Sequence, residues 1–574
     1  MNEQKTAQGE NTSGRFHGRL IPALTLSLAL SFLLTLFGPL ELFFTNSSEF
    51  DFDLYALLLP LGGMFLVALA AGLIAFGLCQ LIYHRLYDLM LLLGAVGLIC
   101  TYVQGLFLAG NLPPLDGTSI DWNSYHGEYL KSCVLWAVVL LAFVLLTRLL
   151  HMAKMRKLVT GLSLFILAML MVTLVTVGIQ NHGFQRKTQP AVTKTDEFQM
   201  STDQNLVVFV LDAVDSGTLR SLMESSDPDF ADTLEDFTYY PNTVGAYTFT
   251  ELSIPYILTG QWYENEQDFS DYYASAMVAS PLLTKLKDQN YRVGVYEEDL
   301  ICDSVQQGDI DNLEETSLRF TSFTQLAKLE LKLVWFKYAP YPIKRMATVN
   351  MDNFRKILEP TNGSQLFRYV NTDFYQDAGT QKITTTQDKC FRFIHIEGAH
   401  VPLRYDKNVN VIGSSNGSYP QNVECAMTVL NRYLTDLKEA GVYDNTAIVV
   451  MADHGYGIYW NNGFLGRSNP LLAVKGVGEK HAMAISEAPI SYEDLQEAFS
   501  RLLDGKASTQ VFDAKEGEKR SRRFLLYNYL HEDHIEEYYQ NGYATDQSGF
   551  TATGEVYDRN KNAGTKNGHS KHKN

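Results

Sequence analysis

The segment TAIVVMADHGYG, Thr446–Gly457, decides our prediction of the fold. Its five apolar residues, Ala447–Met451, predict a strand that is buried on both faces. Asp453, His454 and Gly455 follow almost at once. A carboxylate beside an imidazole at the end of a core strand suggests a functional site, whose other residues must come from elsewhere in the chain.

A second apolar strand ends in the same way. The segment NLVVFVLDA, Asn205–Ala213, ends in Asp212, and a helix is predicted near Ser216–Met223. Further strands are predicted at YRVGVYEE and CFRFIHIEGAH, and further helices at Pro281–Gln289, Asn422–Ala440 and Tyr492–Leu503. Strands that alternate with helices indicate an α/β domain with a mostly parallel central sheet flanked by helices.

Polar residues gather at one edge of this predicted sheet. Asp212, His400, Asp453 and His454 each come just after the carboxyl end of a strand, where open α/β sheets carry their active sites. Carboxylate and imidazole groups together suit one divalent metal ion. The mixed oxygen and nitrogen donors favour Mn²⁺ or Zn²⁺, and Mg²⁺ or Ca²⁺ stay open.

The segment NTVGAYTFTELSIPYILTG, Asn242–Gly260, offers hydroxyl groups for catalysis. A helix is predicted to begin near Thr248 and to run toward Gly260. A hydroxyl in the first helical turn lies at the positive end of the helix dipole, and a metal ion would further lower its pKa. The simpler interpretation is that Thr248 or Thr250 only caps the helix.

Five apolar segments in the first third of the chain are long enough to cross a bilayer. They are roughly Leu20–Phe44, Leu54–Tyr83, Leu89–Ala109, Cys133–Leu150 and Leu158–Ile179. A signal peptide would supply one short apolar stretch, and helices buried in a soluble core would be shorter and fewer. Residues 20–179 are therefore predicted to form five transmembrane helices.

Charges in the loops predict the orientation. Lys and Arg lie before the first span and in alternate loops, whereas the other loops are acidic. The basic residues are Lys5, Arg15, Arg19, Arg85, Arg148, Lys154, Arg156 and Lys157. By the positive-inside rule, residues 1–19 are cytoplasmic, and the chain after the fifth span is extracellular. We therefore expect a multi-pass protein of the cell membrane.

The rest of the chain is divided by composition. Residues 180–204 are predicted to be a linker, 205–558 the extracellular catalytic domain, and 559–574 a polar, disordered tail.

The formal net charge of -17 argues against nucleic-acid binding. The six cysteines lack metal-ligand spacing, and a disulfide among Cys302, Cys390 and Cys425 stays open.

The order of these motifs resembles the alkaline phosphatase and sulfatase superfamily. Five spans followed by such a domain resemble its membrane-anchored branch, the lipoteichoic acid synthases and the lipid A phosphoethanolamine transferases. The resemblance implies that Asp212, Asp453 and His454 are metal ligands. The segment EGAHVPLRY resembles the His-x-Pro turn of the family, which implies that His400 contacts the phosphate or the leaving group.

The resemblance also bears on the nucleophile. TFTELSIP is similar to the transferase pattern of Thr-x-Thr followed by Ser-x-Pro, and the spacing to Pro255 favours Thr248 as nucleophile and metal ligand. Aligning ILTG with the LLTG of sulfatases favours Thr250 instead. Transferases commonly carry a further His after the DHG motif; here Arg467 is the candidate anion-binding residue.

These features together predict a membrane-anchored transferase. Thr248 would attack a phospholipid donor, form a phospho-threonine intermediate, and pass phosphoglycerol or phosphoethanolamine to a cell-envelope glycolipid or polysaccharide acceptor. The alternative is a sulfatase-like hydrolase, although Asn242–Gly260 contains no cysteine and SIPYI lacks the arginine of the C/S-x-P-x-R motif. A transporter is disfavoured because the spans lack evenly placed charges. An inactive binding protein is opposed by the apparent completeness of the ligand set.

Overall fold

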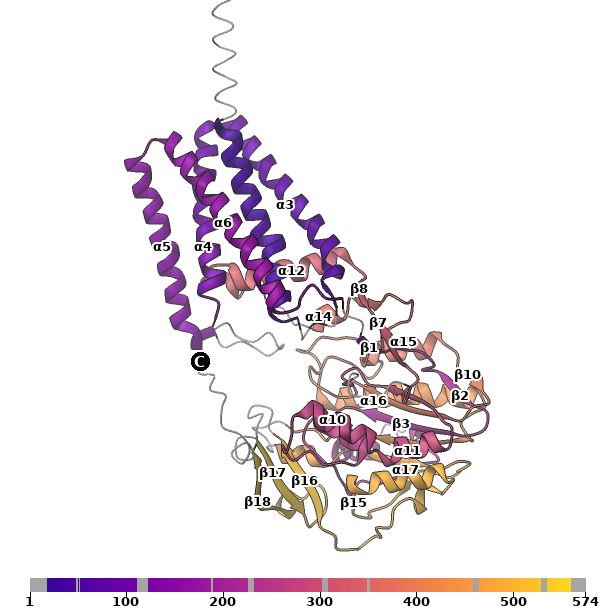
Figure 1. The fold of residues 1–574 in the computed structure, drawn as a ribbon. Coiled ribbons are helices and arrows are strands. Elements are labelled where there is room, and N and C mark those ends of the chain that lie inside the picture. Colours follow the sequence, from indigo (N-terminus) through magenta and orange to yellow (C-terminus); the bar gives the residue numbers. More distant parts are fainter. Residues whose placement is uncertain are drawn as a thin grey trace, which may run out of the picture. The chain divides into compact units, whose positions relative to one another are not determined.

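The structure is a computed structural model, and its helices and strands are labelled in Figure 1. It describes residues 18–47, 50, 52–110, 122–186, 189–225, 232–301, 308–347, 352–457, 464–527 and 534–558. The predicted tail, 559–574, and residues 1–17 lie outside this set. The chain forms two compact units. The helical unit comprises Met1–Thr188 and Thr316–Gly363, and the α/β unit comprises Gln189–Glu315 and Ser364–Asn574.

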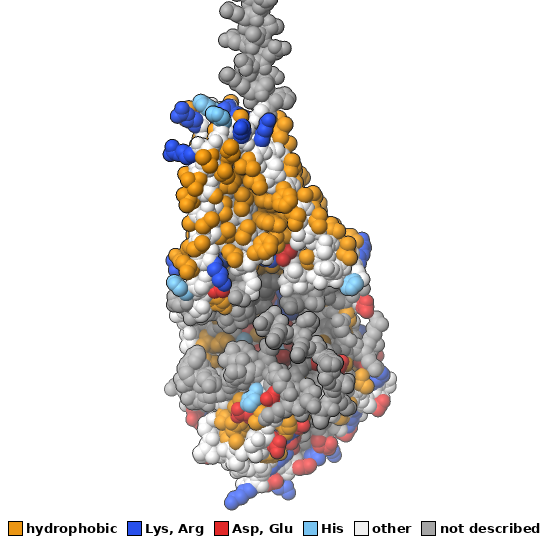
Figure 2. Space-filling view, turned by 60° about the vertical axis from the view of Figure 1, so that its left-hand side comes forward, with side chains coloured by type: hydrophobic (Ala, Val, Ile, Leu, Met, Phe, Trp, Pro, Cys, Tyr) orange, Lys and Arg blue, Asp and Glu red, His pale blue; other side chains and the backbone are white. Residues whose placement is uncertain are grey.

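Five apolar helices of membrane-spanning length form most of the helical unit, as predicted. They are Gly18–Thr45 (which includes η1, Leu33–Phe37, and α2, Gly38–Thr45), α3 (Leu54–Ile82), α4 (His84–Phe107), α5 (His126–Leu149) and α6 (Met152–Gln180), and the short η2 (Trp122–Tyr125) precedes α5. Apolar side chains cover their surface, and Lys and Arg gather at one end (Figure 2). Leu59 and Leu81 are 85% and 83% exposed, which suits helices surrounded by lipid.

A segment far along the chain also belongs to the helical unit. Thr316–Gly363 contains β8 (Leu318–Phe320), α12 (Phe323–Tyr338), α13 (Tyr341–Lys344), α14 (Asp352–Arg355) and β9 (Leu358–Pro360). The ring of Tyr338 packs so closely against Gly105 that a Cβ there would lie 2.1 Å from it. Lys337 forms an ion pair with Glu41, and the Tyr341 N–H donates to Ser132 Oγ over 3.0 Å. The predicted continuous domain, 205–558, is therefore interrupted by this segment, because the apolar face of α12 packs on the spans.

The α/β unit is organised around a seven-stranded sheet. Its strands, in spatial order, are β14 (Ala484–Ile485), β4 (Thr238–Tyr239), β13 (Leu472–Lys475), β12 (Thr446–Met451), β3 (Asn205–Leu211), β11 (Cys390–Ile396) and β6 (Arg292–Tyr296). Only β13 runs antiparallel to its neighbours in this sheet. The four strands β12, β3, β11 and β6 are parallel and adjacent, so their carboxyl ends lie at one edge.

Helices pack in two groups around this sheet. They are α7 (Ser216–Glu224), α9 (Thr250–Thr259), α10 (Phe269–Val278), α11 (Pro281–Asp288), α15 (Asn371–Thr380), α16 (Tyr419–Glu439) and α17 (Leu495–Leu503). Helix α16 contacts α7 and α15, whereas α9 contacts α10, α11 and α17. In Figure 1, β3 lies between α16 and the pair α11 and α17. The predicted α/β architecture is thus confirmed.

Smaller elements complete the α/β unit. They are β1 (Gln189–Val192), β2 (Gln199–Ser201), β5 (Thr243–Val244), β7 (Leu313–Thr316), β10 (Thr384–Thr386), β15 (Ile490–Ser491), β16 (Arg522–Tyr527), β17 (His534–Gln540), β18 (Phe550–Asp558), η4 (Phe464–Ser468), η5 (Tyr492–Asp494), η6 (Ser508–Gln510) and η8 (Gln547–Gly549). Strands β16, β17 and β18 form an antiparallel sheet, and β2 pairs with β10. The predicted linker, 180–204, therefore contains two strands, and its Phe198 and Met200 are buried in the core because they are apolar.

Candidate active site

Asp212 is the first residue after strand β3 and lies on the crowded carboxyl edge of the sheet. The turn after β11 packs directly against it: the Asp212 N–H donates to the Ile396 carbonyl, and the Asp212 carbonyl accepts from the Ala399 N–H. Gly398 makes this contact possible. Its φ is +55°, and a Cβ there would lie 2.5 Å from the backbone N and O of Asp212. Asp212 is therefore held by backbone packing.

Asp453 and His454 follow β12, the parallel neighbour of β3. The Ala213 N–H donates to Asp453 Oδ1 over 3.1 Å, which ties the two strand ends together. Candidate ligand atoms of Asp212, Asp453 and His454 all lie within 4.8 Å of one another, and all three residues are buried. The structure thus brings together three of the predicted metal ligands.

The hydrogen bonds of His454 fix the role of its ring nitrogens. Nδ1 lies 2.8 Å from the Gly455 carbonyl, which can only accept, so Nδ1 carries the proton. In the neutral ring, Nε2 then holds a lone pair. Nε2 lies 3.4 Å from Asp453 Oδ2 and 3.8 Å from Asp212 Oδ1. Three electron-rich atoms therefore face one another in a buried space.

Thr250 is the hydroxyl residue that joins this cluster. It is the first residue of α9, and its Oγ1 donates to Asp453 Oδ2 over 2.6 Å. The same oxygen lies 3.5 Å from His454 Nε2. The N-cap, Phe249, makes no side-chain capping bond to the helix. Thr250 Oγ1 therefore lies at the positive end of a helix and beside two candidate ligands.

The hydroxyl of Thr248 does not lie in the cluster. The prediction that Thr248 is a metal ligand and the nucleophile is therefore wrong. Its side chain is fully buried, its Oγ1 donates to the Tyr527 carbonyl over 2.5 Å, and it accepts from the Tyr527 N–H over 3.1 Å. The hydroxyl therefore both donates to and accepts from the backbone of β16, and it has no proton left to donate to the cluster. Helix α9 begins two residues later than expected, which shifts the register to Thr250.

Asp212 is a buried carboxylate whose surroundings suit a bound cation. Burial and the neighbouring Asp453 carboxylate raise the pKa of Asp212 well above its usual value. Asp212 Oδ1 is buried and has no hydrogen-bond partner among the described residues. An ionised carboxylate in this position is costly unless a cation is bound beside it.

Asp453 and His454 differ from Asp212 in their ionisation. Burial opposes the charge on Asp453, but the neighbouring His395 imidazolium and the hydrogen bond from Thr250 lower the pKa of this carboxyl. Burial lowers the pKa of His454 and so favours its neutral form. An ionised carboxylate, a neutral imidazole and a hydroxyl are the protonation states that metal ligation needs.

The residues present therefore fit a divalent cation. Two carboxylates, an imidazole nitrogen and a hydroxyl oxygen converge, and one carboxylate oxygen has no partner among the described residues. Hard oxygen donors with one nitrogen donor suit Mn²⁺, Zn²⁺ or Mg²⁺.

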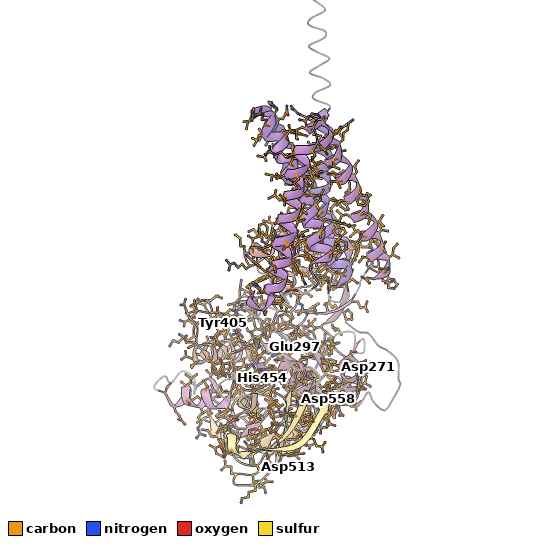
Figure 3. All side chains as sticks on the ribbon, turned by 90° about the vertical axis from the view of Figure 1, so that its left-hand side faces the viewer. Asp271, Glu297, Tyr405, His454, Asp513 and Asp558 are labelled. Atoms are coloured by element: carbon orange, nitrogen blue, oxygen red, sulfur yellow. The ribbon has the colours of Figure 1, made fainter. Side chains whose placement is uncertain are left out.

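Two further residues lie beside this cluster and were missed from the sequence. His395 Nδ1 forms a hydrogen bond with Glu297, the residue that follows β6, and His395 Nε2 lies 3.7 Å from Asp212 Oδ2. His395 Nε2 is buried and has no hydrogen-bond partner within the described part of the chain. Burial opposes a charge on this imidazole, but the carboxylates of Glu297 and Asp212 raise the pKa of His395 to about 10, so a positively charged ring lies beside Asp212. Glu297 and His454 are labelled in Figure 3.

A cavity of about 1020 Å³ belongs to the helical unit, but the cluster described here opens into a different cavity of about 750 Å³ in the α/β unit. His400 and Arg467, the two predicted substrate contacts, both line it. Arg467 lies over the Phe249 ring, and its Nη1 donates to the Thr248 carbonyl over 3.1 Å. Burial lowers the pKa of His400, so a neutral imidazole faces the cavity.

Part of the chain is similar in sequence to a known protein family. Residues 204–476 match the sulfatase family model. No curated protein sequence matches the chain significantly. The fold is similar to that of the lipoteichoic acid synthase LtaP from Listeria monocytogenes, at 11% identity and a TM-score of 0.35, covering 58% of this chain and 82% of that one.

Two further solved structures illustrate the range of relatives. The phosphonate monoester hydrolase SpPMH from Silicibacter pomeroyi has 13% identity and a TM-score of 0.34, with 62% of this chain and 89% of that chain covered. A protein in the alkaline phosphatase superfamily from Vibrio parahaemolyticus has 13% identity and a TM-score of 0.32, with 61% and 77% covered. These names span different chemistries, so no substrate follows from them. The chain carries a sulfatase-family domain over residues 204–476, as its motifs predicted.

Proposed function

We propose that this protein is a membrane-anchored, metal-dependent phosphotransferase that uses Thr250 as its nucleophile. The observation that carries the proposal is the 2.6 Å hydrogen bond from Thr250 Oγ1 to Asp453 Oδ2, inside the cluster of Asp212, Asp453 and His454. Nucleophilic hydroxyl groups in proteins need a neighbour that favours loss of their proton. Asp453 is that neighbour here.

In the first half of the reaction, Thr250 Oγ1 attacks the phosphorus atom of a phospholipid head group. The hydroxyl proton is directed at Asp453 Oδ2, so the oxygen lone pairs remain available for the attack. The bond from phosphorus to the glycerol oxygen of the lipid breaks, and diacylglycerol leaves with a proton. A bound divalent cation would supply charge to stabilise the alkoxide and the crowded phosphorus centre.

In the second half, a hydroxyl of the acceptor attacks the phospho-threonine and restores Thr250. Arg467 and His400 line the same cavity and can hold phosphate oxygens through both steps. The Thr248 carbonyl and the Phe249 ring position the guanidinium of Arg467. Thr248 thus supports the site through its backbone in place of its hydroxyl.

The cavity lining favours an ethanolamine head group over glycerol. The carboxylates of Glu251 and Asp299 line the cavity together with Thr250, and the apolar side chains of Phe269 and Ile301 line it as well. Carboxylates suit an ammonium group, whereas a glycerol head group carries none. We therefore propose phosphatidylethanolamine as the preferred donor, with a cell-envelope glycolipid or polysaccharide as acceptor.

The membrane anchor supports a lipid donor. Extracting a lipid chain from the bilayer costs about 0.8 kcal/mol for each buried methylene, so an enzyme that acts at the membrane avoids most of this cost. The five apolar helices keep the chain at the membrane. On the charge pattern of the loops, we propose that the catalytic domain faces the outside of the cell and acts on the outer leaflet.

A second candidate is a hydrolase of sulfate or phosphate esters, which the match to the sulfatase family favours. The nucleophile and the cation would be the same, and water would replace the acceptor. The two functions differ in whether the transferred group ends on an acceptor or in solution, so product analysis separates them.

The test measures diacylglycerol release by the full-length protein in lipid nanodiscs that contain labelled phosphatidylethanolamine or phosphatidylglycerol. Release that needs Thr250 and a divalent cation, and that is faster with phosphatidylethanolamine, supports the proposal. Thr250→Val is the variant, and Thr259→Val, another α9 threonine whose hydroxyl bonds the Pro255 carbonyl, is the matched control. Release that persists in Thr250→Val or in excess chelator contradicts the mechanism. Faster release with phosphatidylglycerol would contradict only the head-group assignment.

A further inference from the structure

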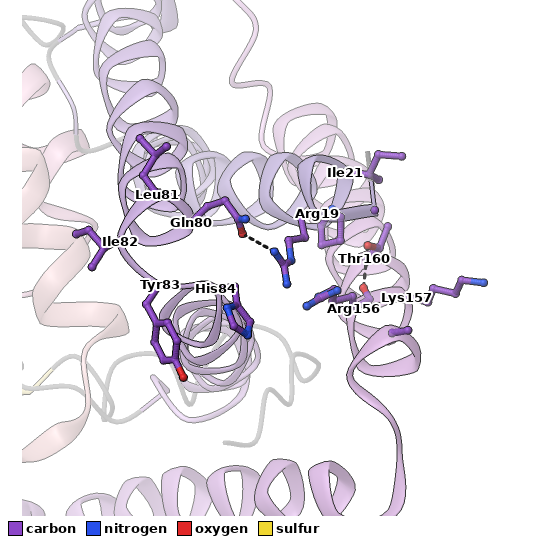
Figure 4. A pocket seen from close by; sticks show the side chains of 13 residues that line it. Arg19, Ile21, Gln80, Leu81, Ile82, Tyr83, His84, Arg156, Lys157 and Thr160 are labelled. Carbon is purple, nitrogen blue, oxygen red and sulfur yellow. Dashed lines mark hydrogen bonds between the residues drawn. The ribbon is translucent and has the colours of Figure 1, made fainter. Parts of the chain in front are cut away.

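A second large cavity lies at one end of the helical unit, far in sequence from the catalytic residues. Its volume is about 1020 Å³. It is lined by the beginning of the first span, the end of α3 and the beginnings of α4 and α6 (Figure 4). Arg19, His84, Arg156 and Lys157 supply its basic side chains, and among the described residues that line it there is no Asp or Glu. Positive charge is therefore concentrated in a space between transmembrane helices.

Two of these side chains are fixed in place. Arg156 forms a forked pair with Asp88, with Nε 2.9 Å from Oδ1 and Nη2 2.7 Å and 2.8 Å from the two carboxylate oxygens. Arg19 Nη1 donates to Gln80 Oε1 over 3.0 Å, as the dashed line in Figure 4 shows. The charge of Arg156 is balanced by Asp88, so Arg19 carries the main excess of positive charge at the cavity, and the exposed Lys157 adds to it from the rim. Arg19 and Lys157 both belong to long helices of the helical unit.

The first turns of α4 and α6 add to this field, whereas the C-terminus of α3, which lines the same cavity, opposes it. Helices α4 and α6 begin at the cavity, at His84 and Met152, and the first described residues of the span Gly18–Thr45 also line it. The side chains of the N-cap residues, Tyr83 in α4 and His151 in α6, accept no hydrogen bond from the first helical turn, so they leave its backbone N–H groups available. The N-terminus of a helix carries partial positive charge and binds anions well when cationic side chains accompany it.

A separate, apolar cavity lies among the same helices. It has a volume of about 620 Å³ and lies between the first span, α3 and α4. Cys79 and Leu86 line it, whereas Gln80 and His84, their near neighbours in α3 and α4, line the basic cavity. Neighbouring residues of the same two helices therefore line a polar space and an apolar space. A basic cavity together with an apolar cavity fits an amphiphile better than a small free anion, which would leave the apolar cavity empty.

We propose that the two cavities together bind one anionic phospholipid, with its phosphate head group among Arg19, Lys157 and the helix ends and an acyl chain in the apolar cavity. Basic pockets between transmembrane helices suit anionic head groups. The loop charges predict that this end faces the cytoplasm, so the lipid comes from the leaflet opposite to the proposed donor. The inference does not depend on the chemistry of the α/β unit.

The experiment measures lipid binding to the full-length protein in mild detergent by native mass spectrometry, with phosphatidylglycerol and zwitterionic phosphatidylcholine as probes. The cavity variant is Arg19→Gln with Lys157→Gln. Its matched control is Arg85→Gln with Lys154→Gln, because these two residues are exposed, belong to α4 and α6, and do not line the cavity. We expect the cavity pair to weaken phosphatidylglycerol binding about tenfold or more, and the control pair to leave it within about twofold.

A steric variant separates lost binding from lost folding. Thr160→Trp places a large ring at the cavity wall without changing any charge, so it too is expected to displace the lipid. Size-exclusion behaviour and helix content check the fold of each variant. An equal loss of affinity in both charge pairs overturns the proposal, because it indicates diffuse attraction between basic helix ends and anionic lipid. Equal binding of the two lipids, or equally tight binding of inorganic phosphate, also overturns it.

Discussion

Thr248, just before α9, and Thr250, its first residue, have different roles. This contrast gives the most informative prediction. Replacing Thr248 by Val keeps the shape of the side chain and removes only the hydroxyl. The N–H and the carbonyl of Tyr527 then lose a partner in a fully buried position. Each unpaired buried group costs about 1–3 kcal/mol, so the free energy of unfolding should fall by about 2–6 kcal/mol. Turnover by the protein that remains folded should change little.

Replacing Thr250 by Val should have the opposite effect. The hydroxyl that donates to Asp453 Oδ2 over 2.6 Å is lost, and with it the proposed nucleophile. Removal of a nucleophile typically lowers kcat by about 10⁴-fold or more. Thr250→Ser keeps an oxygen at the same position, so it should retain part of the activity.

The assay combines two measurements on the same preparations, denaturant unfolding and diacylglycerol release normalised to the folded fraction. Thr248→Ser is the matched control for stability, because its hydroxyl can still bond Tyr527. The reasoning is refuted if Thr248→Val keeps the unfolding midpoint of the wild type but loses turnover. It is also refuted if Thr250→Val keeps turnover.

Three other predictions concern the cation, the support of the site, and pH. Saturating Mn²⁺ at about 100 times its dissociation constant should stabilise the α/β unit by about 2.7 kcal/mol in thermal unfolding, and no shift would contradict a built cation site. Glu297→Gln should weaken Mn²⁺ binding by about 10–100-fold in titration calorimetry, because Glu297 orients His395 beside Asp212, and an unchanged affinity would remove both residues from the metal centre. Burial raises the pKa of Glu197 to about 8, so the folded state holds a proton that the unfolded state releases above pH 4.5. The stability that this proton supplies is present below pH 4.5 and is lost as the pH rises through about 8. Relative to Glu197→Gln, the free energy of unfolding of the wild type should fall by on the order of a few kcal/mol over this range. Parallel pH profiles of the two proteins would contradict the prediction.

Most of the fold could be predicted from local pattern. The five spans are recognised by their length and composition, and the apolar runs that end in Asp212 and Asp453 predict two parallel core strands. Residues at the carboxyl ends of adjacent parallel strands must lie near one another, so the cluster of Asp212, Asp453 and His454 followed from topology. The missing part of the fold was Thr316–Gly363, because the partner of an amphipathic helix such as α12 cannot be read from its own residues.

The errors at the site have a common cause. The hydroxyl of Thr248 is bound by Tyr527, which lies 279 residues away, and no local motif contains that contact. His395 was counted as part of a buried strand, and only its pairing with Glu297 distinguishes it from a core residue. The signal that could have found it is a charged pair at the ends of β6 and β11, which are neighbours in the sheet.

The most direct test of the central claim is to locate the covalent intermediate. The full-length protein is incubated in nanodiscs with phosphatidylethanolamine and Mn²⁺ without acceptor, quenched in acid, digested, and sequenced by mass spectrometry with electron-transfer fragmentation. The account predicts a phosphoethanolamine group on Thr250, which is absent from the chelator control. A modified residue other than Thr250, or diacylglycerol release with no modified threonine at any time point, would contradict it.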